Sequence, residues 1–353
     1  MLQSAAPVRT GMNDRLLRAC HGEATDCTPV WFMRQAGRYQ PEYQALRRRV
    51  SLLELCKTPD LAAQVTLLPV ERLGVDAAIL FADITLPLAG LGAPFSLVEG
   101  VGPVIERPVR TAADLQTLRR FEPERDVPYV LETIRLVRRA VPVPLIGFAG
   151  APFTLASYLI EGRGSKELQR TKQLLFGAPD VWQDLMTRLT DMTLAYLAAQ
   201  VQAGCQAVQV FDSWVGALSP ADYEASVCPH MRRLFDGLRP LGVPTIHFGT
   251  GSTGLLPLMA QAGGDVIGVD WRVRLADAWA QIGRRAIQGN LDPALLLAPF
   301  EAVEHAARRI LTEAGGRPGH IFNLGHGVLP ETPPDHLRRL VDLVHEHRMT
   351  NNQ

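Results

Sequence analysis

The sequence has no excess of charge of either sign. Its 353 residues include 36 Lys and Arg against 36 Asp and Glu, so the formal net charge at pH 7 is +0. Because a net field is what draws a protein to nucleic acid or to an anionic membrane surface, we expect neither partner. Any anion that the protein binds must therefore be recognised by a local group of side chains.

The sequence also lacks the cysteine spacing of disulfide frameworks and zinc sites. Its five cysteines are odd in number, and none belongs to a C-x-x-C pair. No secretory signal is recognisable at the N-terminus, so we expect a reducing, cytoplasmic location. The nine histidines could supply metal ligands instead, but no two of them stand at ligand spacing at a strand end. We therefore expect no metal held by the protein.

One apolar run imitates a membrane span. Residues 141–160, VPVPLIGFAGAPFTLASYLI, carry no charged side chain over a length that could cross a bilayer. Pro142 and Pro144 would break the opening turns of a helix, and Gly147 and Gly150 would loosen its middle turns. We interpret this run as a strand, a turn and a helix, and we expect no membrane contact.

Short apolar runs alternate along the chain with helical patterns. Each run stops at or close to Gly, Asp, Asn or Arg, and apolar residues at helical spacing come after it. The eight runs predicted as strands are residues 28–33, 77–81, 143–148, 207–211, 244–248, 266–270, 286–290 and 320–324. Helix starts are predicted at Thr58, Ser219, Asp292 and Thr332, each followed by proline, and helix ends at Gly74 and Gly204.

Eight alternating β-α units with nearly continuous apolar strands predict an α/β fold, a single (β/α)8 TIM-type barrel. We assign residues 1–353 to this one domain. Residues 1–27 would form an N-terminal extension with a short helix after Asn13. Residues 95–109 would form a hairpin inserted after the second strand.

Polar side chains come directly after several of these strands, where barrels of this kind place their active sites. Arg34 and Arg38 lie beyond the first strand with no acid between them, and a guanidinium fork matches a carboxylate or a phosphate. The other polar residues expected at this mouth are Asp83, Tyr158, Asp212, Ser213 and His326. Each alone has an ordinary explanation, such as a loop hydrogen bond for Asp83, but their shared position favours a site.

A second motif indicates a different ligand. GTGSTG at residues 249–254 is a G-x-G-x-x-G after a strand, and Asp270 ends the next strand about twenty residues later, as in dinucleotide-binding folds. This unit would be the fifth of eight, and no second nucleotide-binding half is evident. We therefore favour the group of polar residues at the strand ends.

Five segments in order resemble the uroporphyrinogen decarboxylase family. They are PVWFMRQAGRYQPEY (29–43), FADI (81–84), GFAGAPFTLASYLIEG (147–162), FGTGS (248–252) and QGNLDP (288–293). The resemblance implies a distorted (β/α)8 barrel that works as a homodimer without a cofactor. It also implies the reaction, removal of the four acetate carboxyls of uroporphyrinogen III to give coproporphyrinogen III in haem and chlorophyll biosynthesis.

The resemblance further implies roles for individual residues. Arg34 and Arg38 would be the carboxylate-binding and catalytic arginines, and Asp83 would face the pyrrole N–H groups at the centre of the macrocycle. The polar contacts to acetate and propionate would be Tyr158, Ser213 and His326, and the apolar walls would be Ile79, Phe81, Phe148 and Phe211. Trp214 receives no role, because other members of the family can carry histidine there.

The chemistry of the substrate explains this choice of residues. A pyrrole acetate loses CO2 readily only after the ring carbon is protonated, so the ring itself becomes the electron sink that a cofactor would otherwise supply. A carboxylate such as Asp83 would stabilise the resulting cation. Arginine is a poor proton donor, so the residues leave the identity of the acid open. Two alternatives remain, a methyl-transferring relative that uses thiol-bound zinc and a non-enzymatic porphyrin or anion carrier.

Overall fold

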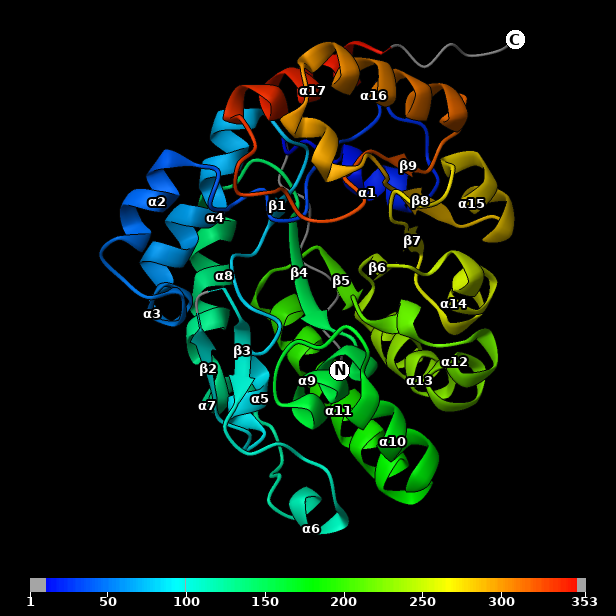
Figure 1. The fold of residues 1–353 in the computed structure, drawn as a ribbon. Coiled ribbons are helices and arrows are strands. Elements are labelled where there is room, and N and C mark those ends of the chain that lie inside the picture. Colours follow the sequence, from blue (N-terminus) through cyan, green and yellow to red (C-terminus); the bar gives the residue numbers. More distant parts are fainter. Residues whose placement is uncertain (1–10, 99, 348–353) are drawn as a thin grey trace.

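A curled sheet of seven parallel strands forms the centre of the protein (Figure 1). The computed structural model describes residues 11–98 and 100–347. The strand order is β1-β4-β5-β6-β7-β8-β9. The strands are β1 (Ala78–Ile79), β4 (Leu145–Gly150), β5 (Ala207–Asp212), β6 (Thr245–Gly249), β7 (Val266–Gly268), β8 (Ala286–Gln288) and β9 (His320–Ile321). The predicted α/β fold of the TIM type is confirmed.

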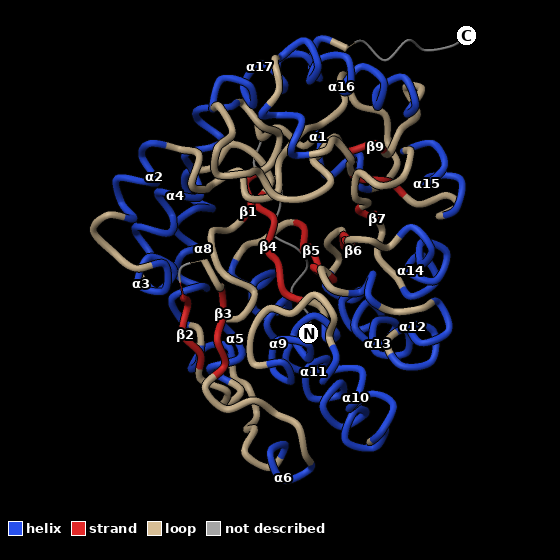
Figure 2. The backbone as a smooth tube through the Cα atoms, in the orientation of Figure 1, coloured by secondary structure: helices blue, strands red, loops and turns tan. Residues whose placement is uncertain are grey.

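Helices surround this sheet, and Figure 2 shows the strands as an inner arc with the helices outside it. The helices are α1 (Arg15–Cys20), α2 (Pro41–Arg47), α3 (Leu52–Lys57), α4 (Pro59–Leu73), α5 (Leu86–Gly90), α6 (Ala112–Leu115), α7 (Pro123–Asp126), α8 (Pro128–Ala140), α9 (Pro152–Glu161), α10 (Gln169–Gly177), α11 (Pro179–Ala203), α12 (Pro220–Ser226), α13 (Cys228–Leu238), α14 (Leu256–Ala262), α15 (Leu275–Gln281), α16 (Phe300–Ala314) and α17 (Pro334–Glu346). The short 3-10 helices are η1 (Val215–Ala217), η2 (Arg239–Leu241), η3 (Thr253–Leu255) and η4 (Pro293–Leu297).

The predicted helix boundaries agree with the structure to within one residue. Ser219 begins α12, where its hydroxyl accepts a hydrogen bond from the Asp222 amide, and Gly74 ends α4 in the left-handed conformation that glycine adopts without strain. The predicted start at Thr332 is one residue early, because Pro333 is the cap of α17.

The apolar run 141–160 forms β4, a one-residue turn and α9, as predicted. Within the described ranges, no helix combines the length and the apolar character that a membrane span needs. Within the segment predicted as a hairpin, residues 95–109, β2 (Phe95–Val98) pairs antiparallel with β3 (Gly102–Ile105). The short helix of the N-terminal extension is α1, while residues 1–10 of that extension lie outside the described residues.

The prediction of a regular first strand at residues 28–33 is wrong. This segment contributes one parallel bridge, from Val30 to Phe322 beyond β9. On its other side, the amide of Asp76 donates to the carbonyl of Val30 at 2.8 Å, just before β1. The segment therefore joins the two edges of the sheet through one bridge, with bonds from Phe322 N to Pro29 O at 2.9 Å and from Trp31 N to Phe322 O at 3.3 Å, and not through a continuous ladder.

Side chains supply the hydrogen bonds that are missing at this junction, which we call the seam (residues 28–35). The carboxylate of Asp76 accepts from the Val30 amide at 2.8 Å. The amide side chain of Gln35 accepts from Phe32 N at 3.0 Å and donates to Ala77 O at 2.9 Å. Because buried backbone groups need partners, these side chains make the irregular closure stable.

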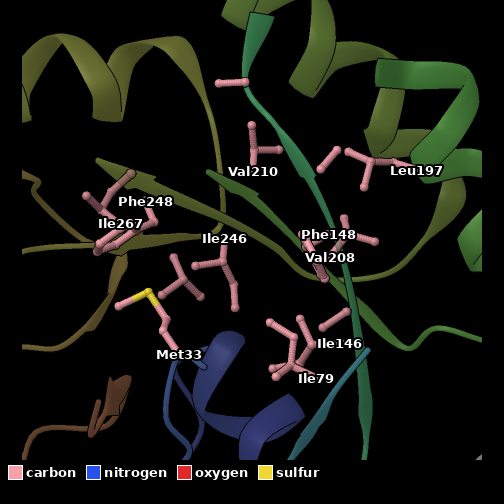
Figure 3. Close-up of a cluster of buried hydrophobic side chains, with 14 of the residues drawn as sticks. Met33, Ile79, Ile146, Phe148, Leu197, Val208, Val210, Ile246, Phe248 and Ile267 are labelled. Carbon is pink, nitrogen blue, oxygen red and sulfur yellow. The ribbon is translucent and has the colours of Figure 1, made fainter. Parts of the chain in front are cut away.

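The strand register decides which side chains face the barrel interior. Phe148, Gln209 and Ile246 are lateral neighbours in the ladder and share one face. The opposite face meets the helices, since a Cβ at Gly147 would touch Gln200 of α11. Figure 3 shows the buried side chains gathered between the strands, among them Met33, Ile79, Ile146, Phe148, Ile246 and Phe248.

Candidate active site

Three aromatic rings lie in a row at the C-terminal ends of β4, β5 and β6. Phe148 meets Phe211 edge to face at 5.5 Å between ring centroids, and Phe211 meets Phe248 at 5.8 Å. The ring of His326 continues the row at 6.5 Å from Phe248. The structure thus brings together three of the residues predicted for the site, Phe148, Phe211 and His326, in a row of rings that forms an apolar floor for a large ligand.

The predicted wall residue Phe81 has a different environment. Its ring lies 5.7 Å from that of Tyr43, in contact with the small cluster beside α2, α3 and α4. Its amide donates to Thr66 Oγ1 at 3.0 Å. Ile79, two residues earlier, is buried in the main core. Phe81 therefore anchors the strand-end loop to the outer helices as well as standing near the mouth.

Arg34 lies at the turn that ends the seam. Its φ is 59°, in the left-handed region that residues other than glycine rarely adopt. Its exposed side chain lies over Gly327, where an added Cβ would come within 2.7 Å of Arg34 Cγ and closer still to Cδ. The absence of a side chain at residue 327 thus leaves room for the arginine.

His326 is held as a neutral imidazole. Burial, followed by the charge of Arg34, lowers its pKa to about 4. Its Nδ1 accepts a hydrogen bond from the amide of Gly327 at 2.7 Å. A neutral ring that accepts at Nδ1 carries its proton at Nε2, so His326 can donate a hydrogen bond to a ligand.

Tyr158 on α9 connects the charged groups. Burial raises the pKa of its phenol, and the charge of Asp83 adds to this rise. The hydrogen bond from the side chain of Trp214 and the charge of Arg34 lower the same pKa. The rings of Tyr158 and Trp214 meet edge to face at 6.0 Å. A protonated phenol therefore lies where a carboxylate and a guanidinium both act on it. Trp214, which received no predicted role, belongs to the same group of side chains.

Asp83 uses its two carboxylate oxygens differently. Oδ1 accepts from the amide of Thr85 at 2.8 Å and from its hydroxyl at 2.5 Å. This is the loop hydrogen bond that was the ordinary explanation for Asp83. Oδ2 has no hydrogen-bond partner among residues 11–98 and 100–347, and its side chain is only partly buried. The carboxylate is thus oriented by its loop and keeps an oxygen for a ligand.

Arg38 is less closely tied to this group. It is exposed on the loop before α2, where its carbonyl accepts from Gln44 Nε2 at 2.7 Å. Burial raises the pKa of the Tyr43 phenol, the charge of Arg47 lowers it, and the charge of Arg38 lowers it by a smaller amount. The structure therefore leaves the role predicted for Arg38 untested.

The expectation that Asp212 lines the mouth is wrong. This residue is fully buried on the helix-facing side of β5, where its Oδ1 accepts from Thr154 Oγ1 at 3.1 Å and its Oδ2 lies 4.0 Å from His247 Nε2. Alternation along the strand gives it the face opposite to that of Phe211. Ser213 comes next and is partly buried, with its carbonyl accepting from Thr250 Oγ1 at 2.5 Å.

The glycine-rich motif at 249–254 has a structural explanation. Asp270 Oδ2 accepts from the amide of Gly251 at 2.6 Å and from Arg272 Nη1 at 2.5 Å, while Oδ1 accepts from the Arg272 amide at 3.0 Å. The acid that would bind a ribose hydroxyl is thus committed to its own loops. Arg272 was not predicted, although it lies just beyond the sixth run and so fits the same strand-end rule that identified Arg34.

Other features of the described surface do not coincide with this site. Hollows of about 340 and 410 Å³ lie beside α10, and none of the predicted site residues lines them. In the described part of the chain, no group of three or more His, Cys, Asp or Glu side chains could hold a metal ion. All five cysteines are buried and unpaired.

Comparison with known proteins identifies the family. The family model described as uroporphyrinogen decarboxylase (URO-D) matches residues 12–347. Relatives named uroporphyrinogen decarboxylase include one from Carboxydothermus hydrogenoformans, 57% identical over 95% of this chain and 97% of its own length, and one from Thermus thermophilus, 58% identical over 95% and 98%. A methyltransferase from Methanosarcina mazei shares the fold with a TM-score of 0.76 and 22% identity, over 95% of this chain and 98% of its own. By the family match and these identities, the chain belongs to the uroporphyrinogen decarboxylase family.

Proposed function

We propose that this protein decarboxylates the four acetate side chains of uroporphyrinogen III and releases coproporphyrinogen III, as a carboxy-lyase of tetrapyrrole biosynthesis. The observation that carries the proposal is the row of rings formed by Phe148, Phe211, Phe248 and His326 at the strand ends. The charges of Asp83 and Arg34 both act on the partly buried phenol of Tyr158, so an acceptor and a cation accompany these rings. A tetrapyrrole needs this combination, because its N–H donors lie at the centre and its carboxylates at the rim.

The reaction requires a proton and a place for an electron pair. Protonation of the pyrrole carbon next to the one that bears the acetate arm makes the ring cationic. The bond between the methylene and the carboxylate then breaks, its electron pair forms an exocyclic double bond that neutralises the ring, and CO2 leaves. A second proton converts the methylene to a methyl group, and loss of the first proton from the ring carbon restores the pyrrole. Asp83 stabilises the cation through the pyrrole N–H groups, because hydrogen bonds to a charged carboxylate become stronger as positive charge develops on the ring.

The remaining residues bind the arms and faces of the macrocycle in this proposal. Arg34 and Arg38 act in catalysis with Asp83 and hold carboxylates, which match their planar forks. Tyr158, Ser213 and His326 donate hydrogen bonds to acetate and propionate groups. The apolar contacts come from Ile79, Phe81, Phe148 and Phe211. We further propose that the protein is a cytoplasmic homodimer, that one domain spans the chain, and that no metal or cofactor takes part.

An anaerobic incubation tests the proposed reaction. Purified protein is mixed with uroporphyrinogen III in the presence of a strong chelator, and the products are oxidised and separated by their number of carboxyl groups. We expect successive loss of carboxyls from eight to four without any addition. Unaltered substrate would leave the carrier or the methyl-transfer alternative. Decarboxylation that appears only with added zinc would overturn the proposal that no metal takes part.

A further inference from the structure

The loop after β7 carries an arginine that the proposed function has not used. The guanidinium of Arg272 stacks over the ring of Trp271, with its carbon 4.1 Å from the ring centroid. Its Nη1 donates to Asp270 at 2.5 Å. In the residues that the structure describes, Nε and Nη2 have no hydrogen-bond partner, and the side chain is 52% exposed. Arg272 is thus oriented from two sides and keeps donors for a ligand.

The backbone that carries Arg272 is also fixed. Asn290 Nδ2 donates to the carbonyls of Asp270 at 2.8 Å and Val273 at 2.7 Å, on either side of the arginine. Asp270 holds the amides of Gly251 and Arg272 in addition to the guanidinium. Because the loop and the guanidinium are already ordered, ligand binding here would cost the protein little additional conformational entropy.

Arg272 and Arg34 lie on either side of the segment 325–327. An added Cβ at Gly325 would lie 3.0 Å from the Trp271 ring and closer to the Trp271 amide, while one at Gly327 would meet the side chain of Arg34. His326 lies between these two glycines. After burial, the charge of Arg34 lowers its pKa, that of Asp270 raises it and that of Arg272 lowers it. The segment 325–327 therefore separates Arg34 from the Arg272–Asp270 pair.

We propose that Arg272 binds a rim carboxylate of the tetrapyrrole substrate, different from the carboxylate that Arg34 holds. This inference rests on the proposed function, since that substrate brings eight carboxylates to a protein whose net charge is +0. Counter-charge must then come from individual side chains at the mouth. A stacked guanidinium with free donors is suited to this task, because its planar fork binds carboxylate with two parallel hydrogen bonds.

The test compares Arg272→Gln with a matched variant, Arg274→Gln. Arg274 lies on the same loop, but its Nε bonds to Glu313 of α16 at 3.3 Å, so its replacement removes the same charge away from the mouth. Rates with uroporphyrinogen III are measured anaerobically over a range of substrate concentrations. We expect Arg272→Gln to raise KM about tenfold or more with kcat within about threefold of wild type, because a contact to a carboxylate that does not react contributes uniform binding. Arg272→Lys, which keeps the charge, should raise KM by less.

Two further measurements separate binding from structure. Added salt should raise KM of the wild type more than KM of Arg272→Gln, because the lost contact is ionic. Melting temperatures of all variants should stay close to that of the wild type, since Asp270 retains its two backbone donors. A KM for Arg272→Gln within twofold of wild type, or an equal rise for Arg274→Gln, would overturn the inference. Wild-type protein that leaves the substrate unaltered would instead overturn the proposed function.

Discussion

Substitutions at Asp83 can separate its role in its own loop from its proposed role in catalysis. Asp83→Asn keeps an oxygen that can accept from Thr85, but it replaces the unpaired oxygen with an N–H2 group that would face the pyrrole N–H donors. Charge-assisted hydrogen bonds contribute about 1.5–3 kcal/mol each, so the variant should lose at least ~3 kcal/mol of transition-state stabilisation. We expect kcat/KM to fall about a hundredfold or more, and Asp83→Glu, which keeps the charge, to fall less.

The control for this prediction is Asp292→Asn. Asp292 caps η4 through the Ala294 amide in the same way that Asp83 caps its own loop, but it lies outside the predicted site. It should keep full activity. If Asp83 only capped its loop, Asn would substitute almost freely and Glu would be the worse variant. Activity of Asp83→Asn at or above that of Asp83→Glu, with both folded by thermal melting, would therefore contradict the catalytic role.

Gly327 controls the position of Arg34 by having no side chain. Its φ is outside the left-handed region, so alanine is allowed by the backbone, but the new Cβ would occupy the space of Arg34 Cγ and Cδ. The arginine must then move, and displacement of a catalytic group by about an ångström can reduce rates by a large factor. We expect Gly327→Ala to lose about tenfold to a hundredfold in kcat/KM with little change in melting temperature.

Gly254→Ala is the matched control for Gly327→Ala. A Cβ at Gly254 would have nothing within 4 Å, and this glycine also has no positive φ. Its kinetics should equal those of the wild type. Full activity in Gly327→Ala would mean that Arg34 either tolerates the displacement or does not contact the substrate.

The seam (residues 28–35) is the part of the sheet that the sequence pattern did not predict correctly. Strands such as β4 and β6 were identified because they are buried on both faces and read as continuous apolar runs. Residues 28–33 have the same pattern, but beyond one backbone bridge they depend on hydrogen bonds to the side chains of Gln35 and Asp76, which no local periodicity reveals.

The candidate site was predictable to a similar degree. The rule that strand ends gather at one mouth identified Arg34, Tyr158 and His326, whose interactions the structure describes. It failed for Asp212, because one residue along a strand reverses the face. It also did not single out Arg272, which we propose as a further carboxylate ligand. Its neighbour Asp270 was considered only within the nucleotide motif that was set aside, whereas the acid pairs with this arginine.

The seam also yields a prediction about stability. Gln35 is fully buried and satisfies two backbone groups, so Gln35→Leu would leave the Phe32 amide and the Ala77 carbonyl without partners. Each buried unsatisfied group costs about 1–3 kcal/mol, so we expect the unfolding free energy to fall by about 2–6 kcal/mol in denaturant titrations. Gln44→Leu, which replaces an exposed glutamine that bonds to Arg38 O, should lower it by less than about 1 kcal/mol. Equal losses in the two variants would contradict a special role for Gln35.

Asp76 ties the two ends of the described chain to the seam. Its buried carboxylate accepts from Val30 N at 2.8 Å, Asn13 Nδ2 at 2.8 Å and Arg15 Nη1 at 3.1 Å beside α1, and it bonds to His345 Nε2 of α17 at 2.7 Å. These bonds keep its pKa below the ordinary value, against burial, which is the largest single influence and raises it. A charged Asp76 thus holds α1, α17 and the closure of the barrel together.

This linkage predicts how stability depends on pH. Because the folded pKa of Asp76 lies below the unfolded value of about 3.9, its contribution is complete above that value and is lost as pH falls through the folded pKa. Asp76→Asn should lower the unfolding free energy by about 2–3 kcal/mol at pH 7, and the difference from wild type should shrink below about pH 4. Asp26→Asn removes the other acid that Arg15 binds, but that carboxylate is 66% exposed, so its effect should stay below about 1 kcal/mol. Denaturant titrations of the three proteins at several pH values test this prediction. If the difference in unfolding free energy between Asp76→Asn and wild type stayed unchanged at pH 3, the charge of Asp76 would not be what joins the two ends.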